Sequence, residues 1–143
     1  MQKKERSKYI PPEADINILI AEDEEYNFLF ISEILSEYNV NISRAYNGKM
    51  AVDICASNTK INLVLMDVRM PVMDGYEATK KIKEFRPDLP IIVQTAFAME
   101  QDRTKALKEG CDDYISKPVN NELLMDLIIK YAPADFALKR VPK

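Results

Sequence analysis

Short apolar runs alternate with helix-like stretches along this chain, and that alternation restricts its fold more than any other feature. The runs at residues 16–21, 63–66 and 91–93 are almost continuously apolar and rich in β-branched residues, as in strands covered on both faces. Weaker strand signals stand at 41–45 and 114–115. Strands that are separated by single helices with short connections predict one parallel sheet with helices on both faces.

Helix signals fill the intervals between these runs. Asp74 and Glu77 are spaced as in a capping box, and Gly110 is the residue type favoured directly after a helix end. Asn120 can cap a last helix. The expected helices cover about residues 28–38, 48–56, 75–86, 99–109 and 121–128.

We expect one α/β domain over residues 15–132, between a basic linker or tail at 1–14 and a C-terminal tail at 133–143. Residues 1–13 and 132–143 each have a net charge of +2, so with −3 for the whole chain the stretch between them carries −7. Such charged ends are typical of solvated tails, and we expect no direct contact with nucleic acid. The apolar runs are too short to cross a bilayer and no apolar stretch follows the basic start. We therefore expect no membrane insertion, no secretion signal and a cytoplasmic location.

The sequence of 143 residues contains no histidine, and its three glycines, Gly48, Gly75 and Gly110, lie far apart. The missing imidazole excludes Ser-His-Asp catalysis, Cys-His nucleophile activation and histidine-containing zinc sites. The scattered glycines exclude a glycine-rich phosphate loop. Cys55 and Cys111 are too few for a disulfide framework or a thiolate metal cluster, and we interpret them as small buried hydrophobes.

Acidic residues follow two of the predicted strands. Glu22 and Asp23 come directly after the first strand, and Asp67 ends the third. Each has a simpler interpretation, as a helix-dipole partner or a turn residue, but parallel strands bring their carboxyl ends to one edge of the sheet. Three carboxylates within about 5 Å would repel by about 3 kcal/mol per pair at an effective dielectric constant of 20. A hard cation such as Mg²⁺ would relieve that repulsion.

Two more polar groups follow the remaining strands. Thr95 ends the fourth strand and can donate one hydrogen bond, while Lys117 follows the fifth and carries a point charge suited to phosphate. A turn threonine and an exposed loop lysine would be the simpler interpretations. Together with the acids, these groups supply a carboxylate nucleophile, a metal site and two partners for phosphoryl oxygens.

Four segments carry a family resemblance: ILIAED at 18–23, MDVRMPVMDG at 66–75, QTA at 94–96 and DYISKP at 113–118. In order and spacing they resemble the CheY-like receiver domain of two-component response regulators over about residues 16–131. The resemblance implies a flavodoxin-like, doubly wound (βα)5 fold with a five-stranded parallel sheet of order 2-1-3-4-5. The sequence around Thr95 and Tyr114 resembles that of receivers in hybrid sensor histidine kinases.

The resemblance also implies a role for each site residue. Asp67 would accept the phosphoryl group, Lys117 would pair with it, and Pro118 would follow a cis bond. Thr95 would be the switch hydroxyl and Tyr114 the switch aromatic. The implied Mg²⁺ ligands are Glu22, Asp23, Asp67 and the backbone carbonyl of Arg69.

Phosphorylation of Asp67 would replace a single negative charge by an acyl phosphate with more charge and three acceptor oxygens. Thr95 would then move in to donate a hydrogen bond and Tyr114 would swing inward, repacking the face made by the fourth helix, fifth strand and fifth helix. That face is also where a homodimer could form. The expected donor is a histidine kinase or a phosphotransfer domain, because this sequence holds no histidine of its own.

The chain would thus be a signalling phosphoacceptor with self-catalysed phosphotransfer and autodephosphorylation rather than a conventional enzyme. An aspartyl-phosphate hydrolase would need a second Asp where Arg69 stands, and a flavin module would need a hydroxyl- and glycine-rich loop where residues 22–25 are acidic. The remaining alternative is a receiver-like docking module that acts without phosphorylation. The sequence leaves open whether the domain belongs to a hybrid kinase or stands alone.

Arg69 and Phe97 lie two residues after Asp67 and Thr95, at positions where receivers tune hydrolysis. A bulky apolar Phe97 would hinder the approach of water in line with the phosphoryl bond, so we predict a long-lived phosphoaspartate. Phe97→Ala should shorten its lifetime, measured as loss of the phosphoryl adduct with time. Equal decay in the variant and the wild type would contradict the prediction.

Overall fold

The structure is a computed structural model that describes residues 15–96, 100–134 and 136–141. Its strands are β1 (Ile16–Ala21), β2 (Val40–Ala45), β3 (Leu63–Asp67), β4 (Ile91–Thr95) and β5 (Asp113–Ser116). Its helices are α1 (Glu25–Leu35), α2 (Gly48–Ser57), α3 (Gly75–Phe85), α4 (Glu100–Lys108) and α5 (Asn121–Tyr131). All strand pairs are parallel, and the order β2-β1-β3-β4-β5 confirms the predicted topology.

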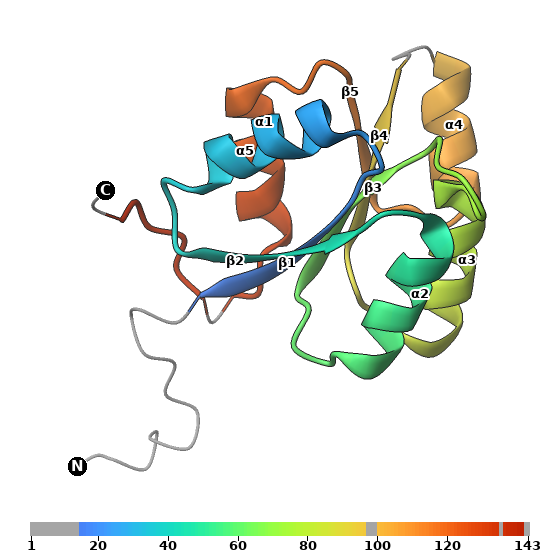
Figure 1. The fold of residues 1–143 in the computed structure, drawn as a ribbon, viewed down its shortest axis with the longest axis horizontal. Helices are drawn as coiled ribbons and strands as arrows, with labels where there is room; N and C mark the ends of the chain where they lie inside the picture. Colours follow the sequence, from blue (N-terminus) through green and yellow to red (C-terminus); the bar gives the residue numbers. More distant parts are fainter. Residues whose placement is uncertain (1–14, 97–99, 135, 142–143) are drawn as a thin grey trace.

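Helices cover both faces of the sheet, with α1 and α5 on one face and α2 and α3 on the other (Figure 1). Successive residues of β1 therefore enter different cores: Ile18 and Ile20 pack beneath α1 and α5, while Leu19 and Ala21 pack beneath α2 and α3. All four are fully buried. This burial on both faces is the reason why the central strands read as continuous apolar runs.

The first predicted helix extended too far. An apolar stripe to Tyr38 suggested helix up to that residue, but α1 ends at Leu35 and is capped by Ser36. Tyr38 still packs against the core beneath α1 and α5, from the turn that leads into β2. The stripe correctly indicated which side chains share one core, although the backbone had already left the helix.

Residues 136–141 lie along the turn between α1 and β2. The backbone N–H of Asn39 donates to the carbonyl oxygen of Lys139 at 3.0 Å, and the Asn39 side-chain oxygen accepts from the Lys139 N–H at 2.6 Å. Arg140 forms an ion pair with Glu37, and Phe136 packs against the core. This part of the expected C-terminal tail thus packs on the domain.

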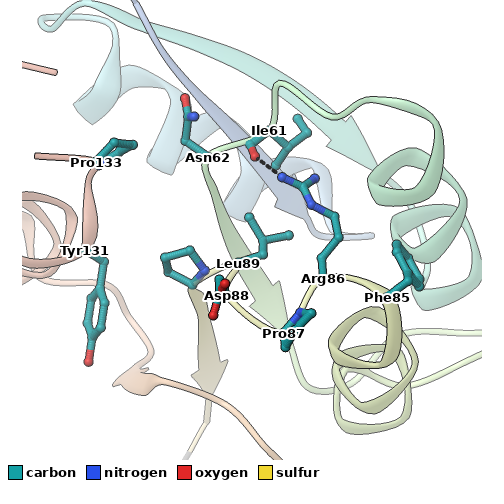
Figure 2. Close-up of a pocket in the computed structure, with 10 residues that line it drawn as sticks. Ile61, Asn62, Phe85, Arg86, Pro87, Asp88, Leu89, Tyr131 and Pro133 are labelled. Atoms are coloured by element: carbon teal, nitrogen blue, oxygen red, sulfur yellow. Dashed lines mark hydrogen bonds between the residues drawn. The ribbon is translucent and has the colours of Figure 1, made fainter. Parts of the chain in front are cut away.

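Arg86 forms hydrogen bonds at the amino-terminal end of the sheet. The acidic residues lie at the other end. Arg86 follows α3 beside a cavity of about 510 Å³ between Leu89, Tyr131 and Pro133 (Figure 2). Its guanidinium donates to Ile61 O at 2.8 Å and, at longer range, to three further carbonyl oxygens, of Cys55, Asn58 and Thr59. These bonds tie the α2–β3 connection to the end of α3.

Replacing Arg86 by Met keeps the aliphatic stem and removes all of these donors. We expect Arg86→Met to lower the free energy of unfolding by about 2 kcal/mol, because several backbone acceptors lose a charged partner. Urea denaturation followed by circular dichroism measures this. Lys81→Met, at an exposed position of α3, is the matched control and should change stability by less than about 0.5 kcal/mol. Equal stability of the two variants would contradict the role of Arg86.

Candidate phosphoryl and metal site

Three carboxylates meet at the carboxyl edge of the sheet, as the strand ends predicted. Glu22 follows β1 directly, Asp23 is the next residue, and Asp67 is the last residue of β3. One ligand oxygen from each lies within 4.8 Å of the others. Glu22 and Asp67 are buried, with 0% and 4% of their surface exposed, whereas Asp23 faces solvent. Two buried carboxylates and one exposed carboxylate leave an open side for a partly hydrated cation.

Glu22 has the most unusual surroundings of the three. Burial raises the pKa of its carboxyl group, hydrogen bonding from Asn27 opposes that rise, and the nearby Asp67 carboxylate adds to it. The Asn27 side chain donates to Glu22 Oε1 at 2.6 Å, and the Glu24 N–H donates to Oε2 at 3.2 Å. A buried carboxylate in such a position gains from any added cation, because the charge otherwise has little solvent around it.

Lys117 supplies the permanent positive charge. Its Nζ lies 3.0 Å from Asp67 Oδ1 and 3.7 Å from Glu22 Oε1. The loop after β5 places it there: the Lys117 N–H donates to Thr95 O at 2.8 Å, and the peptide bond to Pro118 is cis, which confirms the expected isomer. One ammonium between two carboxylates leaves a net negative site.

A cavity of about 190 Å³ opens over Asp67. Thr95 and Lys117 line it together with residues that we did not predict there, among them Tyr76 of α3, Gln94 of β4 and Lys105 of α4. The Lys105 Nζ stands 5.0 Å from the centre of the Tyr76 ring. The cavity therefore has a carboxylate at its base and a hydroxyl and ammonium groups on its walls.

Helix α3 begins close to Asp67 at Gly75, where no residue with a side chain would fit. A Cβ on Gly75 would stand 2.2 Å from the carbonyl oxygen of Asp67. Gly75 N–H donates to Val68 O at 2.8 Å, and Asp74 accepts from the Glu77 N–H at 2.9 Å, which confirms Asp74 as the N-cap of α3. Helix α3 can therefore begin directly against the strand end that carries the acidic group.

The remaining predicted residues are placed as follows. Tyr114 lies on β5, half-buried, and packs against the core beneath α2 and α3. Thr95 is buried at the end of β4. Arg69 borders both the cavity over Asp67 and a second one beside Asp23. Phe97 lies outside the described residues.

Reasoning from the sequence missed two groups that hold the acidic loop. Asn27 contacts Glu22 from α1, and Arg44 of β2 donates from Nε and Nη2 to Glu22 O at 3.1 and 3.0 Å. The Arg44 guanidinium also lies 4.2 Å from the ring centres of Phe28 and Tyr46. The signal for Asn27 was present, since it shares the buried stripe of Ile31 on α1, where an apolar residue is expected.

The structure is that of a doubly wound α/β protein with a cluster of charged side chains at the carboxyl ends of its strands, where proteins of this fold bind their ligands. The chain belongs to the response regulator receiver domain family, whose model matches residues 18–129.

Relatives include both long and short proteins. A stretch of 119 residues is 39% identical to hybrid signal transduction histidine kinase I of Dictyostelium discoideum, covering 78% of this chain but 7% of that protein. Over 111 residues the chain is also 39% identical to chemotaxis protein CheY of Halobacterium salinarum, covering 78% of this chain and 92% of that one. This sequence thus spans a small part of the hybrid kinases that it matches.

A solved structure has a similar fold, with a TM-score of 0.78 and 32% sequence identity over 86% of this chain and 95% of the other. It is the co-crystal structure of the histidine phosphotransfer signaling protein Ypd1 with the receiver domain of its downstream response regulator Ssk1, from Saccharomyces cerevisiae. Receiver domains bind Mg²⁺ at an acidic pocket, and this chain has such an acidic cluster. In the described part of the chain, no helix is long and apolar enough to span a membrane.

Proposed function

We propose that this receiver domain takes a phosphoryl group onto Asp67 from a phosphohistidine. The observation that carries the proposal is the pairing of the buried Asp67 carboxylate with Lys117 at 3.0 Å beneath an open cavity. In the reaction the bond from phosphorus to the donor nitrogen breaks and a bond to an Asp67 oxygen forms, and the imidazole leaves with the electron pair of the broken bond. In autodephosphorylation, water attacks phosphorus, the bond to the Asp67 oxygen breaks, and the carboxylate and inorganic phosphate are released.

The chemistry of the donor set fits Mg²⁺, because carboxylate oxygens with an open, solvated side suit a hard cation. Glu22, Asp23, Asp67 and the backbone carbonyl of Arg69 would hold it. Bound Mg²⁺ would neutralise charge that accumulates on the phosphoryl oxygens. The chain's own part is to keep the Asp67 oxygen aimed into the cavity and to hold Lys117 beside it.

Thr95 and Tyr114 would transmit the modification, as the family resemblance implies. Thr95 borders the cavity, so its hydroxyl is close enough to respond to new acceptor oxygens above Asp67. Tyr114 is half-buried on the neighbouring strand, next to the face made by α4, β5 and α5. Exposed Leu107 and Leu123 make that face a candidate for homodimer contact. The cytoplasmic location and the tuning roles of Arg69 and Phe97 stay predictions.

Incubation with acetyl phosphate and Mg²⁺, followed by intact-mass measurement, tests the acceptor role. We expect an adduct of one phosphoryl group on the wild type and none on Asp67→Asn, because the amide oxygen is a poor nucleophile. An adduct of the same yield on Asp67→Asn would place the chemistry elsewhere. A wild type that forms no adduct with acetyl phosphate or any phosphohistidine donor would favour the alternative of a docking module that needs no phosphorylation.

We also propose that the donor docks on α1. Three large apolar side chains, Tyr26, Leu29 and Phe30, lie on this helix with 78%, 54% and 39% of their surface exposed. The helix begins two residues after Asp23, so a partner seated on it reaches the cavity over Asp67. The solved receiver complex with a histidine phosphotransfer protein makes such a protein the expected occupant.

Leu29→Ser should therefore slow phosphoryl transfer from a phosphorylated histidine phosphotransfer protein by about tenfold, the effect of losing about 1.4 kcal/mol of contact. Its rate with acetyl phosphate should be unchanged, because that donor needs no docking face. Ile129→Ser, at an exposed apolar position on α5, is the matched control and should transfer normally. Normal transfer to Leu29→Ser would remove α1 from the docking proposal.

A further inference from the structure

Gln94 breaks the pattern of its strand. Strand β4 has the sequence IIVQT, its residues are buried, and Gln94 exposes 1% of its surface. A strand covered on both faces is expected to be apolar at such a position. Its register partner on β3 is Asp67, and the next residue is Thr95. A buried amide therefore lies on the strand next to the expected phosphoryl acceptor, one residue before the expected switch hydroxyl.

Asn27 links the Gln94 amide to Glu22, one of the proposed Mg²⁺ ligands. Asn27 Nδ2 donates to Gln94 Oε1 at 3.3 Å and to Glu22 Oε1 at 2.6 Å. The two hydrogens of one NH₂ group are thus divided between a carbonyl and a carboxylate. Exchanging the oxygen and nitrogen of Gln94 would set two donors against each other, so these contacts also fix the orientation of both amides.

The other end of Gln94 has no such partner. Its Nε2 is buried and makes no hydrogen bond with any of the residues that the structure describes. An unpaired buried donor opposes folding, and an apolar side chain of the same length would not carry one. Residues that break local rules in this way are expected mainly where function needs them.

We infer that Gln94 is a positioning residue for the metal site: through Asn27 it holds the Glu22 carboxylate in the orientation that binds Mg²⁺. Without the Gln94 carbonyl, one hydrogen of the Asn27 amide loses its acceptor and the side chain is no longer held from two sides. The Glu22 carboxylate then loses the defined direction of its shortest hydrogen bond. The inference rests on the proposed Mg²⁺ site. Residues that do not contact a metal but orient its ligands commonly contribute strongly to metal affinity.

Isothermal titration calorimetry with Mg²⁺ and thermal unfolding without it test the inference on one variant. Gln94→Met has nearly the same length and no polar atoms. We expect its Mg²⁺ dissociation constant to rise about tenfold, while its melting temperature stays close to that of the wild type, because the change removes one unpaired donor and leaves one hydrogen of Asn27 without its acceptor. A residue that only supports the fold would show the opposite, a lower melting temperature with intact Mg²⁺ affinity, and that result would overturn the inference.

A double-mutant cycle tests the route through Asn27. In the Asn27→Ala background, Gln94→Met should change the Mg²⁺ dissociation constant by less than about twofold, because the two residues act through one contact. A full further loss in that background would overturn the route. Thr79→Val is the matched control: it removes a buried hydroxyl that donates to Gly75 O at 2.7 Å and should lower the melting temperature without changing Mg²⁺ affinity. A wild type that does not bind Mg²⁺ would instead overturn the proposed metal site.

Discussion

The repulsion between the carboxylates of Glu22, Asp23 and Asp67 is the constraint on which the rest of this site depends. Parallel strands bring these groups within 4.8 Å of one another, and at that distance each charged pair costs about 3 kcal/mol at an effective dielectric constant of 20. Lys117 offsets part of this through its contact with Asp67. Burial of Glu22 raises its pKa and so limits the charge that the site can hold without a cation. The same charge imbalance would favour the binding of a divalent ion and, with it, of a phosphoryl group.

The fold can hold such a cluster because the strands beneath it are fixed from both sides. β1 and β3 are buried on both faces, so neither strand end can move away from the other without opening one of two cores. Gly75 then lets α3 approach the carbonyl of Asp67, and Arg44 fixes the backbone of Glu22 from β2. Apolar packing sets the positions of the acids, and polar contacts set their directions.

This division explains what could be predicted from the sequence. The parallel sheet and the meeting of Glu22, Asp67 and Lys117 follow from alternation and from the geometry of parallel strand ends, which need no knowledge of side-chain conformation. The strand order came from the family resemblance. The end of α1 at Leu35 was missed because Tyr38 enters the same core from a turn. Asn27 stood out as a polar residue in the buried stripe of α1, but its pairing with Gln94 of β4 was missed, because that pairing depends on which side-chain rotamers meet.

Histidine is absent from all 143 positions, and the site gives that absence a mechanistic meaning. Under the proposed function Asp67 receives a phosphoryl group beside Lys117, but no group in this sequence can supply a phosphoimidazole. The donor nitrogen must come from outside these residues, which requires a docking face within reach of Asp67. The exposed apolar side chains on α1 begin three residues after Asp23, so the surface that a donor would need and the acid that it would modify are placed by the same β1–α1 connection.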